Sequence, residues 1–233
     1  MWGNMRNIKA VIFDLDDTLY PEVEYVKSGF KHVSNIIYSM IHVDKDYVYE
    51  QFWNLFSEDK NNVFNRFLQL HDIQNSSMEK CMIYEYRRHL PAITLTSEHI
   101  EILEWLVNMG YMIGIITDGR PEGQRNKIKA LNLEKYCNNV IVTDELGGIE
   151  FRKPNKTAFL NMLTYLKIKS EEAIYIGDNP KKDFISCNKL GINTIMLVTN
   201  TGVHSQEILD NAYRANISIN NLLDLKTLLE GWS

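Results

Sequence analysis

The chain alternates short apolar runs with longer segments in which apolar residues recur at helical spacing. Ile8–Phe13 is nearly continuous in apolar residues and is followed at once by the acidic sequence Asp14-Leu15-Asp16-Asp17. A short run without alternation is typical of a strand buried on both faces of a parallel sheet. Four further runs share this character: Tyr111–Ile116, Val140–Val142, Ala173–Ile176 and Ile192–Val198.

Amphipathic helical segments separate these runs. In Ser97–Met109, Ile102 and Leu106 lie on one apolar stripe, and Gly110 follows as a stop signal. Strands that alternate with helices of this length predict an α/β fold, in which an open parallel (Rossmann-like) sheet is flanked by helices. The other segments of this kind are Arg120–Leu131, Asn155–Leu166, Pro180–Leu190 and Asn221–Leu229.

One long stretch breaks the alternation. Residues 21–91 contain no strand-like run, but aromatic residues such as Phe52, Trp53 and Phe56 recur at helical spacing. We interpret this stretch as three or four helices inserted between the first and second strands. The expected organisation is an α/β core domain of residues 1–20 and 92–233, with a helical domain of residues 21–91. The alternative is a set of extra helices packed on the sheet without a function of their own.

Composition and charge describe an ordinary globular protein. Apolar residues make up 45% of the 233 residues and charged residues 24%, which excludes a disordered or coiled-coil chain. The net charge of −5 gives no electrostatic reason to expect nucleic acid as the main partner. The three cysteines show no CxxC spacing, and the apolar runs are too short for a signal-peptide core or a membrane span. We therefore expect a cytoplasmic protein without a membrane partner, and the sequence leaves its oligomeric state open.

Polar residues follow the predicted strands, at the edge where an open parallel sheet binds its ligands. Carboxylates that converge at one point repel each other unless a cation neutralises them, and hard oxygen ligands select Mg²⁺. The candidates at this edge are Asp14 and Asp16 after the first strand, Thr117, Asp118 and Gly119 after the second, Thr143, Asp144 and Glu145 after the third, Lys153 before a helix, and Asp178 and Asp183 after the fourth.

The lysine in this set indicates a second anion such as a phosphoryl group, because a pure metal site has no use for a cationic side chain. A hydroxyl and loop N–H groups can hold the phosphoryl oxygens. A carboxylate beside the phosphorus can attack it and form an aspartyl-phosphate. A second carboxyl two residues later lies on the same side of an extended segment and can pass a proton.

Four segments that carry these residues resemble, in the same order, the four motifs of the haloacid dehalogenase-like (HAD) hydrolase superfamily. Each segment is a weak signal alone, but four in order form a strong joint signal. The resemblance extends from Ile8 to Val198, and the helical insert falls where that superfamily places one type of cap domain. The four segments are FDLDDTLY (13–20), IITDG (115–119), RKP (152–154) and GDNPKKD (177–183).

The resemblance implies roles for the matching residues. Asp14 is the expected nucleophile, and Asp16 is the expected general acid and base that protonates the leaving oxygen. Lys153 is expected to hold Asp14 and the phosphoryl charge. The expected phosphate-binding residues are Thr117, Asp118, Gly119 and Lys153. The expected ligands of Mg²⁺ are Asp14, the backbone carbonyl of Asp16, and Asp178. Asp183 is expected either to bind the metal directly or to hold one of its ligands.

The resemblance also bears on the type of reaction. The superfamily's dehalogenases lack an acid two positions after the nucleophile and need no metal, so Asp16 favours phosphoryl transfer. The segment TDGRPEGQRNKIKAL (117–131) resembles small-molecule phosphatases acting on sugar phosphates, acylneuraminate phosphates or nucleoside monophosphates. In those enzymes Gln and Lys follow the turn, as Gln124 and Lys127 do here.

The expected function is Mg²⁺-dependent hydrolysis of a small phosphomonoester through an aspartyl-phosphate. The alternative within the same fold is a phosphotransferase or a sugar-phosphate mutase. A signalling receiver domain is disfavoured because its phosphoacceptor lies mid-chain and no helical insert follows its first strand. A non-catalytic binding protein is disfavoured because the set of candidate residues is intact.

Other charged residues near the motifs have simpler interpretations. Asp17 is expected to cap a helix or form a turn. Lys181 and Lys182 are expected on a solvated helix face, and Thr201-Gly202 in a plain turn. Asp144 and Glu145 either belong to a turn or touch the site.

Overall fold

The computed structural model describes residues 7–198 and 210–231, so Thr201-Gly202 lies outside the described residues. The chain divides into two compact units. One comprises Met1–Glu22 and Thr94–Ser233 and is called the core unit below. The other, Val23–Ile93, is called the insert.

The core unit is built on a six-stranded sheet in the order β3-β2-β1-β4-β5-β6, and every adjacent pair is parallel. This confirms the predicted open parallel α/β fold. The short strand β6 was not predicted. The strands are β1 Ala10–Phe13, β2 Met112–Thr117, β3 Asn139–Val142, β4 Ala173–Gly177, β5 Asn193–Leu197 and β6 Ile217–Ile219.

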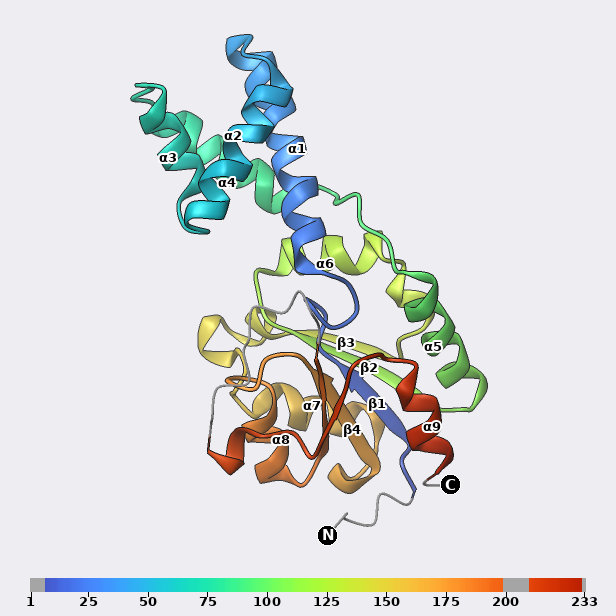
Figure 1. Ribbon diagram of the computed structural model, residues 1–233. Helices are drawn as coiled ribbons and strands as arrows, with labels where there is room; N and C mark the ends of the chain where they lie inside the picture. Colours follow the sequence, from blue (N-terminus) through green and yellow to red (C-terminus); the bar gives the residue numbers. More distant parts are fainter. Residues whose placement is uncertain (1–6, 199–209, 232–233) are drawn as a thin grey trace. The chain divides into compact units, whose positions relative to one another are not determined.

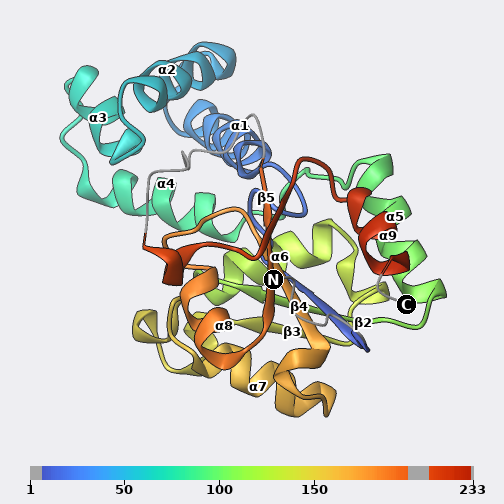
Figure 2. The same ribbon diagram turned by 60° about the horizontal axis from the view of Figure 1, so that its bottom comes forward.

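Helices cover both faces of this sheet, with α7 and α8 on one face and α5 and α9 side by side on the other (Figures 1 and 2). Lys226 of α9 pairs with Glu101 of α5 at 2.6 Å, which ties these two helices together. The helices are α5 Ser97–Asn108, α6 Pro121–Ala130, α7 Thr157–Leu166, α8 Phe184–Leu190 and α9 Asp224–Glu230, and the 3-10 segments are Leu133–Lys135, Thr143–Leu146, Ile149–Phe151, Ser170–Glu172 and Asn211–Tyr213.

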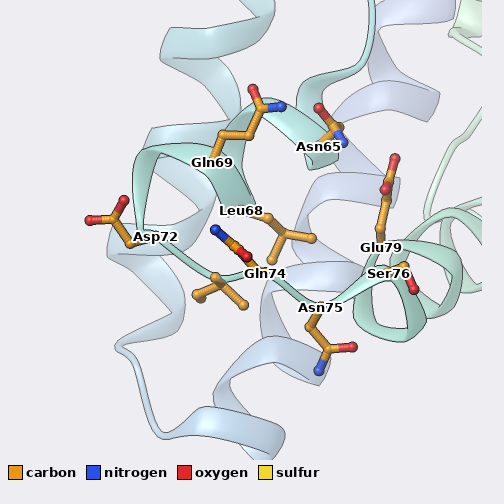
Figure 3. Close-up of a pocket in the computed structure, with 9 residues that line it drawn as sticks. Asn65, Leu68, Gln69, Asp72, Gln74, Asn75, Ser76 and Glu79 are labelled. Carbon is orange, nitrogen blue, oxygen red and sulfur yellow. The ribbon is translucent and has the colours of Figure 1, made fainter.

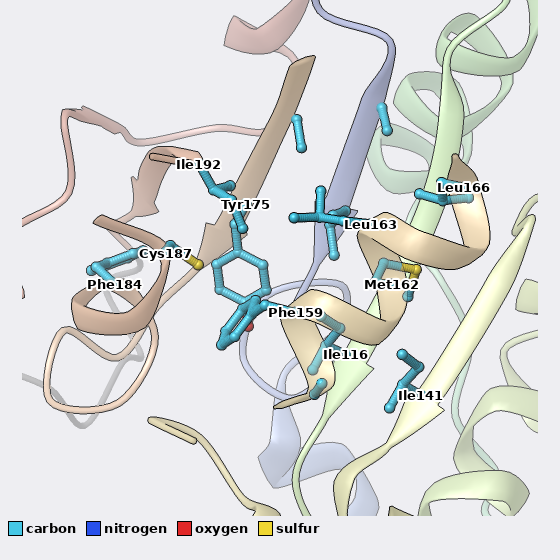
Figure 4. Close-up of a cluster of buried hydrophobic side chains, with 14 of the residues drawn as sticks. Ile116, Ile141, Phe159, Met162, Leu163, Leu166, Tyr175, Phe184, Cys187 and Ile192 are labelled. Carbon is cyan, nitrogen blue, oxygen red and sulfur yellow. The ribbon is translucent and has the colours of Figure 1, made fainter. Parts of the chain in front are cut away.

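The apolar core of this unit lies between the sheet and the two helices α7 and α8 (Figure 4). Alternate residues of β1, Ala10 and Ile12, face this cluster and are fully buried. Phe159 of α7 packs edge-on against Tyr175 of β4, with ring centroids 5.0 Å apart. The packing fixes the strands, and with them the loops that leave their carboxyl ends.

The insert is a four-helix unit with an aromatic core of its own. Phe52 lies at its centre, with ring centroids 5.4 Å from Phe30, 5.2 Å from Phe64 and 5.0 Å from Phe67. The pairs of Phe52 with Phe64 and Phe67 are edge-to-face, and such pairs add to the stability that burial provides. The helices are α1 Glu22–Ile41, α2 Lys45–Glu58, α3 Val63–Leu70 and α4 Ser76–Arg88.

Across the two described ranges of the chain, no helix is long and apolar enough to cross a membrane.

Candidate active site

Three predicted carboxylates meet at the carboxyl edge of the sheet. Asp14 follows the central strand β1, whereas Asp178 and Asp183 follow its neighbour β4. One carboxylate oxygen of each lies within 4.8 Å of the others, and all three residues are buried. The topology thus brings together side chains that are up to 169 positions apart in the sequence.

Lys153 neutralises part of this negative charge. Its ammonium lies 2.8 Å from Asp14 Oδ1 and 2.9 Å from Asp183 Oδ1, and its side chain is fully buried. Burial would lower the pKa of Lys153, but the charges of Asp14 and Asp183 outweigh burial and raise it. Burial would likewise raise the pKa of Asp14, but Lys153 and Lys182 hold that pKa below its ordinary value. Lys153 therefore stays cationic and Asp14 ionised, which is the state a nucleophile requires.

Tyr175 connects this charged cluster to the apolar core. Its ring packs on Phe159, while its hydroxyl receives a hydrogen bond from Lys153 at 2.8 Å and donates one to Asp183 at 3.1 Å. Figure 4 shows the ring between α7 and the sheet. Tyr175 was not among the predicted site residues, since it stands inside an apolar strand. Only its position just before the motif at 177–183 could have pointed to it.

The close approach of the three carboxylates changes the pKa of Asp178. Burial and the charges on Asp14 and Asp183 raise the pKa of Asp178 to about 8. A divalent cation would relieve this repulsion. The three acids offer only oxygen ligands, a donor set that fits a hard cation such as Mg²⁺. Asp183 Oδ2 also accepts the Asn179 N–H at 2.9 Å, so its carboxylate is fixed in orientation.

Asp16 lies apart from the carboxylate cluster and faces helix α6. Its Oδ1 accepts from Lys127 Nζ at 2.7 Å and from the Tyr20 hydroxyl, and its Oδ2 accepts from Gln124 Nε2 at 2.9 Å. Gln124 Nε2 also donates to Thr117 Oγ1. The predicted acid and the predicted phosphate-binding hydroxyl therefore share a partner.

Asp118 is anchored by its side chain. Its Oδ1 accepts from Thr143 Oγ1 at 2.9 Å and from the Lys153 N–H at 3.0 Å. A carboxylate only accepts hydrogen bonds and repels phosphate, so any contact of Asp118 with a phosphoryl group falls to its backbone N–H. Gly119 follows with a φ of 140°, a conformation that side chains rarely allow.

The structure corrects the interpretation of Lys182. Its ammonium lies 3.3 Å from Asp14 Oδ2 and 3.9 Å from Asp118 Oδ2, with only 27% of the side chain exposed. It is therefore part of the site and not of a solvated helix face. The error arose because Pro180–Leu190 was predicted to be helical throughout, whereas α8 begins only at Phe184 and the preceding turn folds Lys182 inward.

The remaining acids near the motifs have structural partners. Asp17 donates its N–H to the Tyr20 carbonyl at 2.9 Å, and its Oδ1 accepts the Glu22 N–H at 2.8 Å, which agrees with the expectation that it forms a turn or caps a helix. Asp144 forms a two-pronged pair with Arg152 at 2.7 Å for each contact. Glu145 pairs with Arg125 at 2.6 Å.

A cavity of about 520 Å³ lies within the insert, between α3 and the start of α4 (Figure 3). Asn65, Gln69 and Asn75 are among the polar side chains around it. The charged residues that the structure records on its lining are the acids Asp72 and Glu79. Such a lining does not suit a phosphate ester, and the cavity contains none of the predicted site residues.

Comparison with known proteins agrees with this arrangement. A family model described as haloacid dehalogenase-like hydrolase matches residues 11–197. Because the match spans most of the chain, the protein belongs to the haloacid dehalogenase-like hydrolase family. The resemblance noted in the four motifs is thereby confirmed.

Two curated relatives of this chain are named as phosphatases. The chain is 31% identical over 203 residues to the glyceraldehyde 3-phosphate phosphatase of Pyrococcus furiosus, covering 82% of this chain and 81% of that protein. It is 25% identical over 241 residues to the ribulose-1,5-bisphosphate 5-phosphatase of Halopiger xanaduensis, covering 94% and 98%. Within its family, the chain is therefore a phosphatase.

A solved structure shares the fold. The HAD-hydrolase YfnB from Bacillus subtilis, bound to magnesium, matches with a TM-score of 0.66 and 16% identity. The match covers 96% of this chain and 99% of that one. At this level of identity the likeness bears on the fold alone.

Proposed function

We propose that the protein is a Mg²⁺-dependent phosphomonoesterase that acts on a small phosphorylated metabolite through an aspartyl-phosphate on Asp14. The observation that carries the proposal is the buried cluster in which Lys153 joins Asp14 and Asp183 at 2.8 and 2.9 Å, beside Asp178. Among small phosphomonoesters, short sugar phosphates are favoured over nucleotides. The two similar phosphatases are named for a phosphorylated triose and a phosphorylated pentulose.

Asp14, Asp178 and Asp183 would hold the metal, with the backbone carbonyl of Asp16 as a further expected ligand. When bound, Mg²⁺ neutralises the carboxylates and the phosphoryl oxygens. Lys153 keeps Asp14 ionised and adds positive charge beside the phosphoryl group. Thr117 would donate its hydroxyl to a phosphoryl oxygen, as would the N–H groups of the Asp118-Gly119 turn.

The reaction has two steps that the protein's own groups can perform. A carboxylate oxygen of Asp14 forms a bond to phosphorus while the bond from phosphorus to the ester oxygen breaks, and Asp16 gives its proton to that oxygen. Water then attacks the phosphorus of the aspartyl-phosphate. The bond to Asp14 breaks, inorganic phosphate leaves, and Asp16 accepts the proton of the water.

A phosphate-release assay tests the proposal. Wild-type protein with Mg²⁺ should release phosphate from glyceraldehyde 3-phosphate or other short sugar phosphates faster than from nucleoside monophosphates. Asp14→Asn should abolish release, because an amide cannot attack phosphorus, and it should keep the fold because the shape is preserved. Near-wild-type turnover by Asp14→Asn, or activity that survives exhaustive chelation, would contradict the proposal. Conversion of the substrate to an isomer without phosphate release would favour the mutase alternative.

A further inference from the structure

Helix α6 presents two polar side chains to Asp16 from inside the protein. Gln124 and Lys127 are three residues apart and therefore lie on the same face of the helix. Both are only 4% exposed. An amide and an ammonium lose their water on burial, which is unfavourable unless protein partners replace it. Both find such a partner in Asp16, at 2.9 Å for Gln124 and 2.7 Å for Lys127.

The local backbone makes room for this contact. A methyl group on Gly119 would lie 3.1 Å from Cγ of Gln124, and the φ of 140° already disfavours any side chain there. The glycine lets the side chain of Gln124 reach both Thr117 Oγ1 and Asp16 Oδ2. The turn after β2 thus allows Gln124 to contact Asp16, which lies on the loop after β1.

We infer that Gln124 and Lys127 are positioning residues that hold the carboxyl group of Asp16 in place, both when it gives its proton to the leaving group and when it takes a proton back from water. The inference rests on the proposed function. The two side chains contact different oxygens of Asp16, and the Tyr20 hydroxyl donates to the same oxygen as Lys127, so these contacts fix both the position and the rotation of the carboxyl group. Lys127 acts through Asp16 and does not bind the phosphoryl group. The pair consequently determines how well the enzyme cleaves esters whose leaving group needs a proton.

The test compares two substrates with different leaving groups. An alkyl phosphate leaves as an alkoxide and needs the proton, whereas nitrophenyl phosphate leaves with little help. Lys127→Met should lower kcat/KM for the alkyl phosphate by about tenfold to a hundredfold, since a displacement of about 1 Å costs that much. The nitrophenyl ester should lose far less, and Lys127→Arg should restore part of the alkyl activity. Lys129→Met, an exposed change of the same kind on the same helix, is the matched control.

A double-variant cycle separates positioning from a merely structural role. If Lys127 works through Asp16, Lys127→Met should have little further effect in an Asp16→Asn background. The double variant loses both charges of the ion pair, so neither charge is left buried without its partner. It therefore serves as a folded comparison if Lys127→Met alone misfolds. The inhibition constant of inorganic phosphate should be the same in wild type and Lys127→Met. Gln124→Leu should give the same difference between substrates as Lys127→Met.

Two outcomes would overturn the inference. Equal losses on both esters that persist with Asp16→Asn would make Lys127 structural. A weaker inhibition by phosphate in Lys127→Met would make it a ligand of the phosphoryl group. Failure of the proposed function is visible separately, because the wild-type protein would then release no phosphate from either ester.

Discussion

At the scale of single residues, the two oxygens of Asp14 meet different cations. Oδ1 accepts from the Leu15 N–H at 2.8 Å and lies 2.8 Å from Lys153, whereas Oδ2 lies 3.3 Å from Lys182. Lys153 also binds Asp183, so it is fixed from several sides. The side chain of Lys182 is more exposed than that of Lys153, and its charge lies beside the acids that would hold the metal.

Removal of the Lys182 charge should strengthen Mg²⁺ binding. Two unit charges about 4 Å apart interact by roughly 1 kcal/mol even in bulk water, so Lys182→Met should tighten the affinity by at least about fivefold. The measurement is the Mg²⁺ concentration that gives half of the thermal stabilisation. Lys181→Met removes the same charge from the exposed neighbouring position and should leave the affinity nearly unchanged. Weaker Mg²⁺ binding in Lys182→Met would show that the lysine supports the metal site.

The sequence allowed prediction of the residues that stand at strand ends, because parallel topology brings those ends to one edge. Asp14, Asp178, Asp183 and Lys153 converge for that reason. Tyr175 was missed since its hydroxyl reaches the site from inside an apolar strand. The grip of Gln124 and Lys127 on Asp16 depends on how α6 is rotated against the first loop, and a pattern along one chain does not contain that information.

At the scale of secondary-structure elements, strand β4 has to end in glycine. A methyl group on Gly177 would lie 2.5 Å from Oδ2 and 2.7 Å from Cγ of Asp183. Asp183 cannot yield, because its carboxylate is held by Lys153, Tyr175 and the N–H of Asn179. The close approach of strand and side chain is what places Asp183 beside Asp14.

Gly177→Ala should therefore disturb the candidate metal site without changing any charged residue. We expect the free energy of unfolding to fall by about 1–3 kcal/mol, as for other overpacked buried positions, and Mg²⁺ to bind more weakly. Chemical denaturation and titration with Mg²⁺ measure the two effects. In an Asp183→Ala background the same substitution should cost less stability, because most of the clashing atoms are gone. An undiminished cost there would point to the strand backbone instead.

The sequence predicted which helices and strands exist better than it predicted where each one begins and ends. β6 has the sequence Ile217-Ser218-Ile219, which is too short for its period to be recognised, and it forms because β5 offers an open edge. The start of α8 was placed four residues early. The turn before it is set by the Asp183 N–H, which donates to the Asn179 carbonyl at 3.0 Å, and by the carboxylate of Asp183.

At the scale of the whole molecule, the chain consists of two units with separate apolar cores. The insert leaves the core unit shortly after the loop that carries Asp14 and returns before α5. This connectivity supports the proposal that the insert is a cap that selects the substrate and excludes water. Exclusion of water strengthens the charge interactions around a phosphoryl group. The catalytic candidates all belong to the core unit, so chemistry and selection should be separable.

Replacement of residues 23–93 by a short Gly/Ser linker tests this separation. The core unit should still unfold cooperatively, since its sheet and apolar cluster are complete without the insert. It should keep slow hydrolysis of nitrophenyl phosphate and lose most discrimination among sugar phosphates and nucleotides. Circular dichroism with thermal unfolding checks the fold, and kcat/KM across the substrate panel checks the selectivity.

A second variant tests the same prediction without a linker, which could itself disturb the fold. Phe52→Ala removes the central ring of the insert and should destabilise that unit by about 3–5 kcal/mol, while every core residue stays in place. Both variants should flatten the substrate ranking, and the nitrophenyl ester should suffer least. If a folded variant without the insert kept the full ranking, selectivity would reside in the loops of the sheet. The turns at Asp118–Arg120 and Thr143–Glu145 would then be the next positions to change.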